Sequence, residues 1–485
     1  MAVFRLIIPA WILLPFLFES CAALKKRNHE PDAMETAEIA PAIDSALETP
    51  NFSKGEWPSY NWWTLFEDDQ LSEMMELALE GNPDLMAAVA RVRSSDQAAK
   101  KARAPLLPKL NTAFDDNYQH LSKDELVRYP PSTVPAVIKE IHLSLNFEYE
   151  IDLFGKNRNQ YRAAIGLARA QAAEMSQSLL IITTSLAEAY INYGANFMDL
   201  QISRDLVAAR KFYLELTELR RNYGIDDELA IDRARTLLLE GEKVVLEYEK
   251  KMTIAESQLK ILMGMSPDDP REFSPPTLSF DRPFPLPENI PLNLLARRPD
   301  LMAQIWKVEA AAHMIKAAKA AFFPNINLKA FAGLQSLHWN NLFSIESFAG
   351  AINPAINLPL FTGGKLTAQL NEEYANYDAD VYDYNTLVLK AAKEVSDQIK
   401  VLNATTEQAK LESEAFMQIL HSSELTLARY ENGIDDYLTV LNQQIAVMNE
   451  AMNEVEIQNK RYLSILMLIK ALGGGYGQYS GTTEK

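Results

Sequence analysis

The sequence contains the same pattern twice, and this duplication constrains the fold more than any other feature. Residues 82–111 begin with NPDLM and residues 298–327 begin with RPDLM, an offset of 216. Farther along, YGIDDELAIDRA (223–234) parallels NGIDDYLTVLNQ (432–443) at an offset of 209. A pattern that recurs in this way indicates one structural unit made twice. We expect each half to run helix, strand, strand, helix, turn, helix.

The helices are predicted to be very long. Residues 136–266 and 360–485 contain no proline and are rich in Ala, Leu, Glu, Lys and Gln, so helices can run through them unbroken. Each tract holds two glycines 69 residues apart, Gly155 with Gly224 and Gly364 with Gly433. At 1.5 Å per residue each interval would make a helix roughly 100 Å long. We expect Gly224 and Gly433 to be the turns at which the chain reverses.

The repeats, the proline-rich stretch between them and the two terminal regions predict six parts of the chain. In each half, the helix after the turn and the helix before the strands together nearly equal the long helix, so we expect them to stack end to end beside it. The stretch that joins the halves is too rich in proline to be helical. The expected parts are a signal peptide (1–20), an N-terminal extended segment (21–61), repeat 1 (62–266), a proline-rich linker at mid-height (267–291), repeat 2 (292–473) and a C-terminal tail (474–485).

Each half also contains two candidate strands with one apolar and one polar face. Residues 141–154 read IHLSLNFEYEIDLF, in which every odd position is apolar. Side chains alternate between the faces of a strand, so these residues share one face. The other candidates lie near 109–121, 325–338 and 347–360. The fold class is therefore mainly α with a small β part.

The length of the alternation raises the choice between a soluble sheet and a membrane sheet. Strands in soluble proteins are typically five or six residues long, whereas about nine to eleven span a bilayer. Helices of roughly 100 Å would leave the strands end-on and could not cover them. Four strands cannot close a barrel, and an open edge is forbidden in lipid, so several copies would have to supply one barrel. The side chains expected to face lipid are Leu143, Leu145, Phe147 and Tyr149.

The N-terminal residues predict export. A positive start at Arg5 precedes an apolar run over 6–18, the order of a secretory signal. Cys21, the only cysteine, resembles the lipid-accepting residue of a bacterial lipoprotein, although Phe18 and Glu19 depart from that pattern. The alternative is an ordinary signal peptide. A lipidated Cys21 followed by Ala22 would point to the outer membrane.

Composition and motifs exclude several other functions. The net charge of −18 argues against a nucleic-acid partner. The six histidines are scattered without the spacing of metal ligands, and we find no phosphate-binding loop and no nucleophile elbow. We therefore expect no enzyme activity, no cofactor and no metal site. A soluble periplasmic coiled-coil scaffold remains an alternative.

The order of several short motifs resembles the TolC-like outer-membrane factors, in the lipoprotein branch that serves resistance-nodulation-division efflux pumps. The resemblance extends from about Trp62 to Gly473, and each motif alone is weak. The motifs are WWTLFEDDQL (62–71), NPDLMAA, YEIDLFGKNR (149–158), ARRPDLMAQ (296–304), AAKAAFFPNINL (317–328), LPLFTGGK (358–365), KEVSD (393–397) and RYENGIDDYLTVLNQQ (429–444).

The resemblance implies a homotrimer in the outer membrane. Three chains would close one 12-stranded β-barrel surrounded by lipid, and their helices would form a hollow coiled-coil barrel across the periplasm. A periplasmic adaptor and an inner-membrane transporter would meet its tip. The chain would act as a passive exit duct of an efflux pump or, alternatively, of a type I protein secretion system.

The resemblance also places a gate at the tip, near Gly224 and Gly433. Its lining positions here are Leu438, Thr439 and Asn442, where Asn442 replaces a commoner carboxylate. No arginine follows Gly433 directly, which argues against an arginine-latched closed state. The acidic tip residues are Asp226, Asp227, Asp435 and Asp436, with Glu228 beside them. Because acidic residues favour helix N-termini, we expect Asp226 and Asp435 to act mainly as helix caps.

Overall fold

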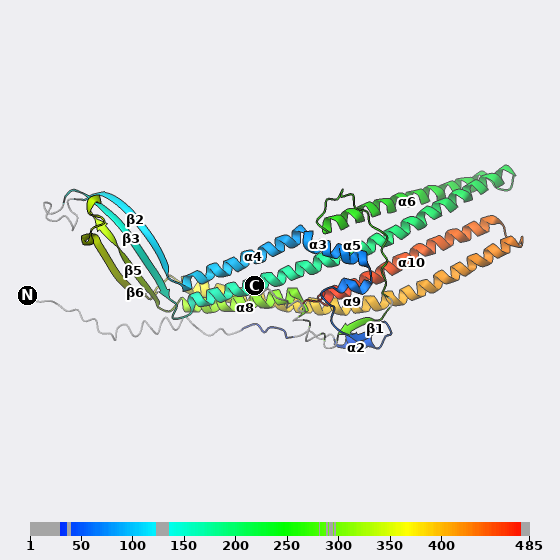
Figure 1. Ribbon diagram of the computed structural model, residues 1–485. Coiled ribbons are helices and arrows are strands. Elements are labelled where there is room, and N and C mark those ends of the chain that lie inside the picture. The colour runs from blue at the N-terminus through cyan, green and yellow to red at the C-terminus, as the bar shows by residue number, and fades with distance from the viewer. Residues whose placement is uncertain are drawn as a thin grey trace, which may run out of the picture. The chain divides into compact units, whose positions relative to one another are not determined.

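The computed structural model describes residues 30–35, 40–122, 135–280, 282–287, 290, 294 and 297–476 (Figure 1). The chain forms two compact units, each assembled from three segments. Unit 1 comprises Met1–Ala33, Val92–Gln171 and Gln304–Tyr384, and unit 2 comprises Met34–Arg91, Ala172–Ala303 and Asn385–Lys485. The two longest helices each begin in unit 1 and end in unit 2.

The four strands of unit 1 form one antiparallel sheet in the order β2-β3-β5-β6. Their bounds are Lys109–His120 (β2), Val137–Ile151 (β3), Asn325–Ser336 (β5) and Phe348–Asn357 (β6). All four lie where the alternation predicted strands. β3 ends earlier than expected because Asp152 already caps the next helix, accepting hydrogen bonds from the backbone N–H groups of Asn157 and Arg158.

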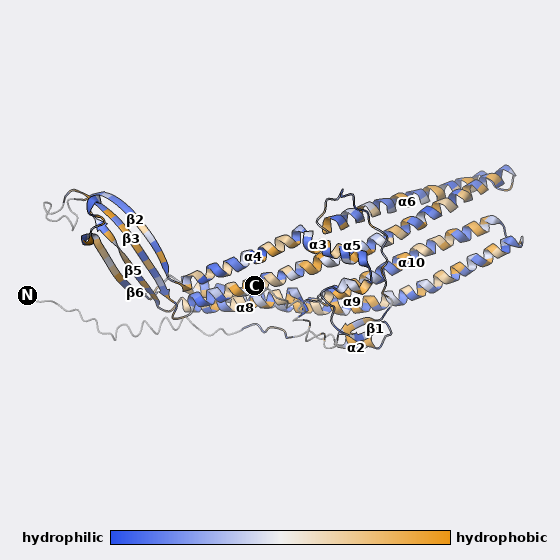
Figure 2. Ribbon diagram, viewed as in Figure 1, coloured by the Kyte–Doolittle hydropathy of each residue, from blue (hydrophilic) through white to orange (hydrophobic). Residues whose placement is uncertain are grey.

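The register places the predicted apolar side chains on a common face. Leu143 lies opposite Phe114 of β2 and Leu334 of β5, and Phe147 lies opposite Leu110 and Ala330. Many large side chains on this face are exposed within the chain, and the strands alternate in colour between apolar and polar residues (Figure 2). The outer strands β2 and β6 each have one free edge within the described part of the chain.

The helices repeat in length as well as in order. The long helices α5 (Lys156–Asn222) and α9 (Lys365–Glu431) each contain 67 residues, and the return helices α6 (Glu228–Leu262) and α10 (Tyr437–Ala471) each contain 35. The helices before the strands are α3 (Asp69–Gly81), α4 (Pro83–Arg103) and α8 (Pro299–Ala320). The predicted duplication and the predicted unbroken helices are both present.

Glycines make the junctions at which a return helix ends. Gly264 follows α6, and a Cβ there would collide with the carbonyl oxygen of Gly81. Gly473 follows α10, and a Cβ there would collide with the carbonyl oxygen of Arg297. Both glycines also have positive φ, a conformation that costs glycine little. The two halves thus share the same close backbone approach at equivalent positions.

The proline-rich linker is held in an extended path across unit 2. Its carbonyl oxygens accept hydrogen bonds from the side chains of Tyr193, Tyr462 and Arg461. Near its end it forms β4 (Phe284–Pro287), which pairs in parallel with β1 (Phe52–Gly55) in a small sheet that was not predicted from the sequence.

The N-terminal segment is not extended throughout, as it was expected to be over 21–61. A short helix, α2 (Ala40–Leu47), precedes β1. The sequence of α2, APAIDSAL, buries Ile43 and Ala46 on one side, and this apolar side stabilises a helix that is too short to form alone. The expectation was therefore wrong for these eight residues.

Asp68 connects the linker to the helices. Its carboxylate is buried and caps α3 by accepting a hydrogen bond from the Leu71 N–H at 2.8 Å. The same carboxylate accepts hydrogen bonds from the Tyr190 hydroxyl at 3.0 Å and the Thr277 N–H at 2.8 Å. Burial is the main cause that raises the pKa of Tyr190. Asp68 therefore joins α3, α5 and the linker at one point.

Candidate functional site at the hairpin tips

Each tip in unit 2 is a helix, a glycine turn and a second helix. Gly224 (φ 73°) and Gly433 (φ 69°) both adopt the left-handed conformation. The Ile225 N–H donates to the Arg220 carbonyl at 2.9 Å, and the Ile434 N–H donates to the Arg429 carbonyl at 2.9 Å. This six-to-one bond, with glycine before it, is the Schellman ending of a helix. The structure thus places both glycines in turns.

The N-caps of the return helices are Asp227 and Asp436. Asp227 accepts a hydrogen bond from the Ala230 N–H at 3.0 Å. Asp436 accepts from the Thr439 N–H at 3.0 Å and from its hydroxyl at 2.8 Å. The expectation that Asp226 and Asp435 act as caps is therefore wrong. The second aspartate of each pair has the extended backbone of an N-cap, and the first still lies in the turn.

Asp226 and Asp435 instead pair with arginines of the preceding helices. Arg220 donates from Nε to Asp226 at 2.8 Å, and Arg429 donates from Nε to Asp435 at 2.6 Å and from Nη2 at 2.9 Å. The hydrogen bond from Arg429 lowers the pKa of Asp435. Each pair closes its own hairpin across the turn.

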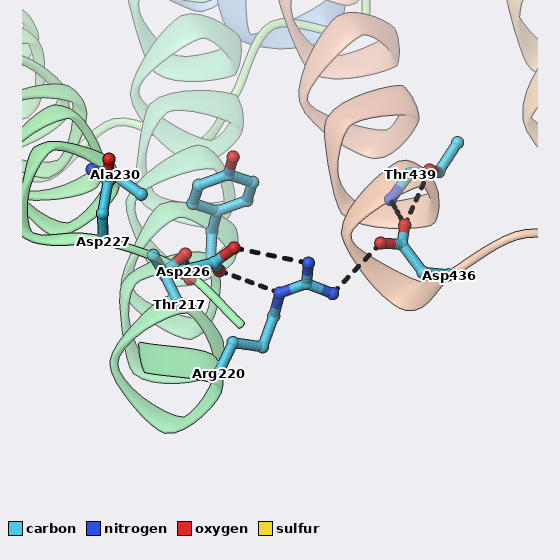
Figure 3. A network of polar contacts seen from close by, with 8 residues as sticks. Thr217, Arg220, Asp226, Asp227, Ala230, Asp436 and Thr439 are labelled. Atoms are coloured by element: carbon cyan, nitrogen blue, oxygen red, sulfur yellow. Dashed lines mark hydrogen bonds and ion pairs between the residues drawn. The ribbon is translucent and has the colours of Figure 1, made fainter. Parts of the chain in front are cut away.

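One of these arginines also joins the two hairpins. Arg220 donates from Nη1 to the Asp436 carboxylate at 3.2 Å, so its guanidinium lies between Asp226 and the N-cap of α10 (Figure 3). This arginine precedes Gly224 by four residues, whereas the resemblance led us to expect such an arginine after Gly433. A signal was available, since Arg220 and Arg429 are themselves separated by the repeat offset of 209.

The predicted gate positions lie in the first turns of α10. Thr439 and Asn442 are exposed in the chain, and Leu438 is partly buried.

The start of α10 is held by aromatic contacts as well as by the ion pair to α5. Tyr437 packs edge-on against Tyr430 of α9, with ring centroids 5.1 Å apart. It also packs edge-on against Phe212 of α5, at 5.7 Å. The residues next to the predicted gate therefore contact both long helices.

Other predicted features fall elsewhere or outside the described residues. Cys21 and the signal peptide lie outside the part of the chain that the structure describes. Within that part, none of the helices combines the length and apolar character needed to cross a membrane. The described residues also contain no group of acidic, histidine or cysteine side chains that could hold a metal ion.

Solved structures with this fold define the class of protein. The outer membrane protein VceC from Vibrio cholerae is 30% identical, has a TM-score of 0.78, and covers 87% of this chain and 100% of its own. The CmeC outer membrane channel of Campylobacter jejuni has the same fold, with a TM-score of 0.83 at 21% identity over 94% of this chain and 95% of its own. The class is an outer-membrane channel protein of Gram-negative bacteria that extends into the periplasm.

The family follows from the sequence itself. The model of the outer membrane efflux protein family matches residues 74–265 and 290–474, one match for each repeat, and the chain belongs to this family. The multidrug resistance outer membrane protein MdtP of Escherichia coli K12 is 26% identical over 95% of this chain and 94% of its own length. The toluene efflux pump outer membrane protein TtgF of Pseudomonas putida is 28% identical over 95% and 91%. The TolC-like resemblance is confirmed.

Proposed function

We propose that three copies of this chain form the exit duct of a tripartite efflux pump. The observation that carries the proposal is the sheet of unit 1, which has an exposed apolar face and a free edge on both β2 and β6 among the described residues. Backbone groups at a free edge go unpaired in hydrocarbon, so neighbouring copies must pair with both edges. Three four-stranded sheets would close one barrel of 12 strands.

The duct opens and closes at the hairpin tips. Leu438, Thr439 and Asn442 line the constriction, and the Arg220–Asp436 pair holds α10 against α5 in the closed state. Both side chains of this pair are partly exposed, so one pair contributes only about 0.2–1 kcal/mol. Contacts of that size hold a gate shut but yield to the binding of another protein. A periplasmic adaptor and an inner-membrane transporter of the resistance-nodulation-division type supply that binding.

The cargo consists of small organic molecules that leave without chemical change. Relatives are named for multidrug resistance, toluene efflux and fusaric acid resistance. Selection then occurs in the transporter, because a duct with acidic tips has little to discriminate between neutral organic solutes. Cys21 carries the lipid that anchors the mature chain, and mass spectrometry of the purified protein would detect it.

Conductance in planar bilayers tests the proposal together with the crosslinked mass. We expect step-like currents from a species of three chains. The double variant Leu438→Ala with Asn442→Ala should raise the single-channel conductance, because smaller side chains would widen the constriction. A soluble monomer without currents would overturn the proposal.

A matched control lies near the other end of α5. Leu167→Ala with Gln171→Ala also removes one leucine and one amide four residues apart, and it lies more than fifty positions from Gly224. It should leave the conductance at the wild-type value. A control that raised the conductance as much as the Leu438 and Asn442 variant would place the constriction elsewhere.

A further inference from the structure

The chain of unit 1 passes between helix and sheet four times, and each passage has the same order of side chains. Large apolar residues lie next to the strand, and basic residues lie beyond them on the helix. The apolar residues are exposed, and Phe361 is 92% exposed. Two of them, Phe154 and Phe323, stack with ring centroids 4.8 Å apart. The full apolar set is Leu107, Leu153, Phe154, Phe323, Leu360 and Phe361.

The basic residues stand out against an acidic chain. Segments 98–109, 155–170, 312–330 and 358–371 contain no Asp or Glu, although the whole chain has 65 acidic and 47 basic residues. We select six exposed bases, at least one from each passage, and call them the basic collar. They are Lys100, Lys101 and Arg103 of α4, Arg158 of α5, Lys316 of α8 and Lys365 of α9.

Helix dipoles account for only half of this pattern. Bases are favourable at helix C-termini, where α4 and α8 place theirs. Arg158 and Lys365 lie instead at the N-termini of α5 and α9, where a positive charge is unfavourable. Neither helix has an acidic residue in its first turn, although the Asp152 carboxylate caps α5 and the Asp152 carbonyl oxygen accepts a hydrogen bond from the Arg158 side chain. The helix dipole therefore does not explain the bases at the N-termini of α5 and α9.

Two other bases, Lys156 at the start of α5 and Lys329 of β5, pair with acidic residues on the polar face of β3. Lys156 pairs with Glu150 at 2.6 Å, and Lys329 pairs with Glu148 at 3.3 Å. Such an ion pair, by contrast, is found for none of the three bases of α4 and not for Lys365 among the described residues.

Bases also gather between α5 and α8. The pKa of His313 in α8 is lowered by burial first, and then by the positive charges of Lys316 and Arg162. Positive charges from α5 and α8 therefore act on the same residue of unit 1.

We propose that the basic collar binds the phosphate groups of anionic phospholipids in the periplasmic leaflet of the outer membrane. The order of the side chains matches the order of a bilayer, with the apolar strand face at the acyl chains, the exposed apolar residues of the passages at the border of the acyl layer and the bases at the phosphates. This contact goes beyond the proposed pump function, because it concerns the lipid around the channel and not its cargo.

The test measures lipid selection by the assembled full chain. The protein is placed in nanodiscs of phosphatidylcholine with a minor share of phosphatidylglycerol, and the lipids that remain bound are counted by native mass spectrometry. We expect the variant Lys100→Gln, Lys101→Gln, Arg103→Gln and Lys365→Gln to lose about tenfold or more of the wild-type preference for phosphatidylglycerol.

Two controls keep the test decisive. A variant with the same charge change far from the collar, Lys211→Gln, Arg235→Gln, Lys243→Gln and Lys410→Gln, should keep the preference. If the collar variant does not assemble, the wild-type protein is measured at low and at high salt instead. Its preference for phosphatidylglycerol should weaken at high salt, because salt screens the attraction between exposed bases and phosphates. No preference in the wild type, or equal loss in both variants, would overturn the proposal.

Discussion

The two repeats have the same backbone but hold it with different side chains. In repeat 1, the Asn82 side chain donates to the Leu262 carbonyl at the end of α6, at 2.8 Å. In repeat 2, the equivalent residue is Arg298, which donates to the equivalent Ala471 carbonyl at the end of α10, at 3.4 Å. Duplication has therefore kept the position of the contact, while the chemistry that makes it has changed from an amide to a charge.

The hairpin tips of the two repeats also share their backbone and differ in side-chain contacts. Arg220 of repeat 1 contacts both Asp226 and Asp436, whereas Arg429 of repeat 2 contacts Asp435 of its own hairpin. The partner that the repeat offset would assign to Arg429 is Asp227, the N-cap of α6. If the proposed trimer places the hairpins of the two repeats alternately around one ring, Arg429 should reach Asp227 of the neighbouring chain.

The substitutions with the largest expected effect place a charge on the apolar strand face, and they should be equally damaging in both repeats. Leu145→Arg in β3 and Ile352→Arg in β6 both put a charge near the middle of the apolar face of the sheet. Each should block membrane assembly, because such a charge costs about 2–4 kcal/mol near the bilayer midplane in every copy. Heat-modifiable trimers in the membrane fraction would report assembly. Ser144→Arg is the matched control on the polar face, and equal loss at Ser144 and Leu145 would contradict the barrel.

Substitutions at the helix-end contacts should lower the free energy of unfolding by different amounts in the two repeats. Arg298 is buried and pairs with Asp300 at 2.7 Å and with Glu394 at 2.6 Å. Arg298→Ala leaves Asp300 without its charged partner and should cost about 2–4 kcal/mol, a value reduced because Glu394 is half exposed. Asn82→Ala loses a cap and one hydrogen bond and should cost about 1–2 kcal/mol. Denaturant unfolding of both variants measures the difference, and equal costs would contradict the predicted contrast.

A third contrast between the repeats depends on pH. Burial raises the pKa of Asp199 in α5 to about 6, whereas the equivalent position in α9 is the neutral Gln408. Because this pKa is higher in the folded state than in the unfolded chain, the folded state binds the proton more tightly, and low pH favours folding. This contribution to the free energy of unfolding is lost as the pH rises through about 6. Asp199→Asn should therefore stabilise the protein by about 1–3 kcal/mol at neutral pH. Below about pH 4, where the carboxyl is protonated even in the unfolded chain, the substitution should change stability little.

The measurement is the thermal unfolding midpoint of the wild type and of Asp199→Asn, from below about pH 4 to neutral pH. Gln408→Asn, the control in the other repeat, should show no pH-dependent gain. An Asp199→Asn variant whose stability followed the wild type at every pH would show that Asp199 is ionised without cost in the assembled channel.

The sequence was sufficient for features that depend on period and spacing. The alternation over 141–154 identified β3, and the absence of proline identified α5 and α9, because each pattern acts within one element. It was not sufficient for contacts between elements. The pairing of β1 with β4 joins residues more than 200 positions apart, and the Arg220–Asp436 link depends on how two hairpins lie together. The choice of cap between Asp226 and Asp227 required the backbone of the turn.

The smallest effect concerns the tip and tests the difference between the two arginines. Arg220→Gln removes the link to Asp436 within one chain, and the loss of about 0.2–1 kcal/mol per copy should raise the open probability a few-fold in single-channel recordings. Arg429→Gln should raise it as well if Arg429 reaches Asp227 of the neighbouring chain. Arg235→Gln, which removes an exposed pair with Glu218 inside one hairpin, is the control. An effect of Arg220→Gln alone would confine the latch to the single chain, and no effect of either variant would remove the arginines from the gate.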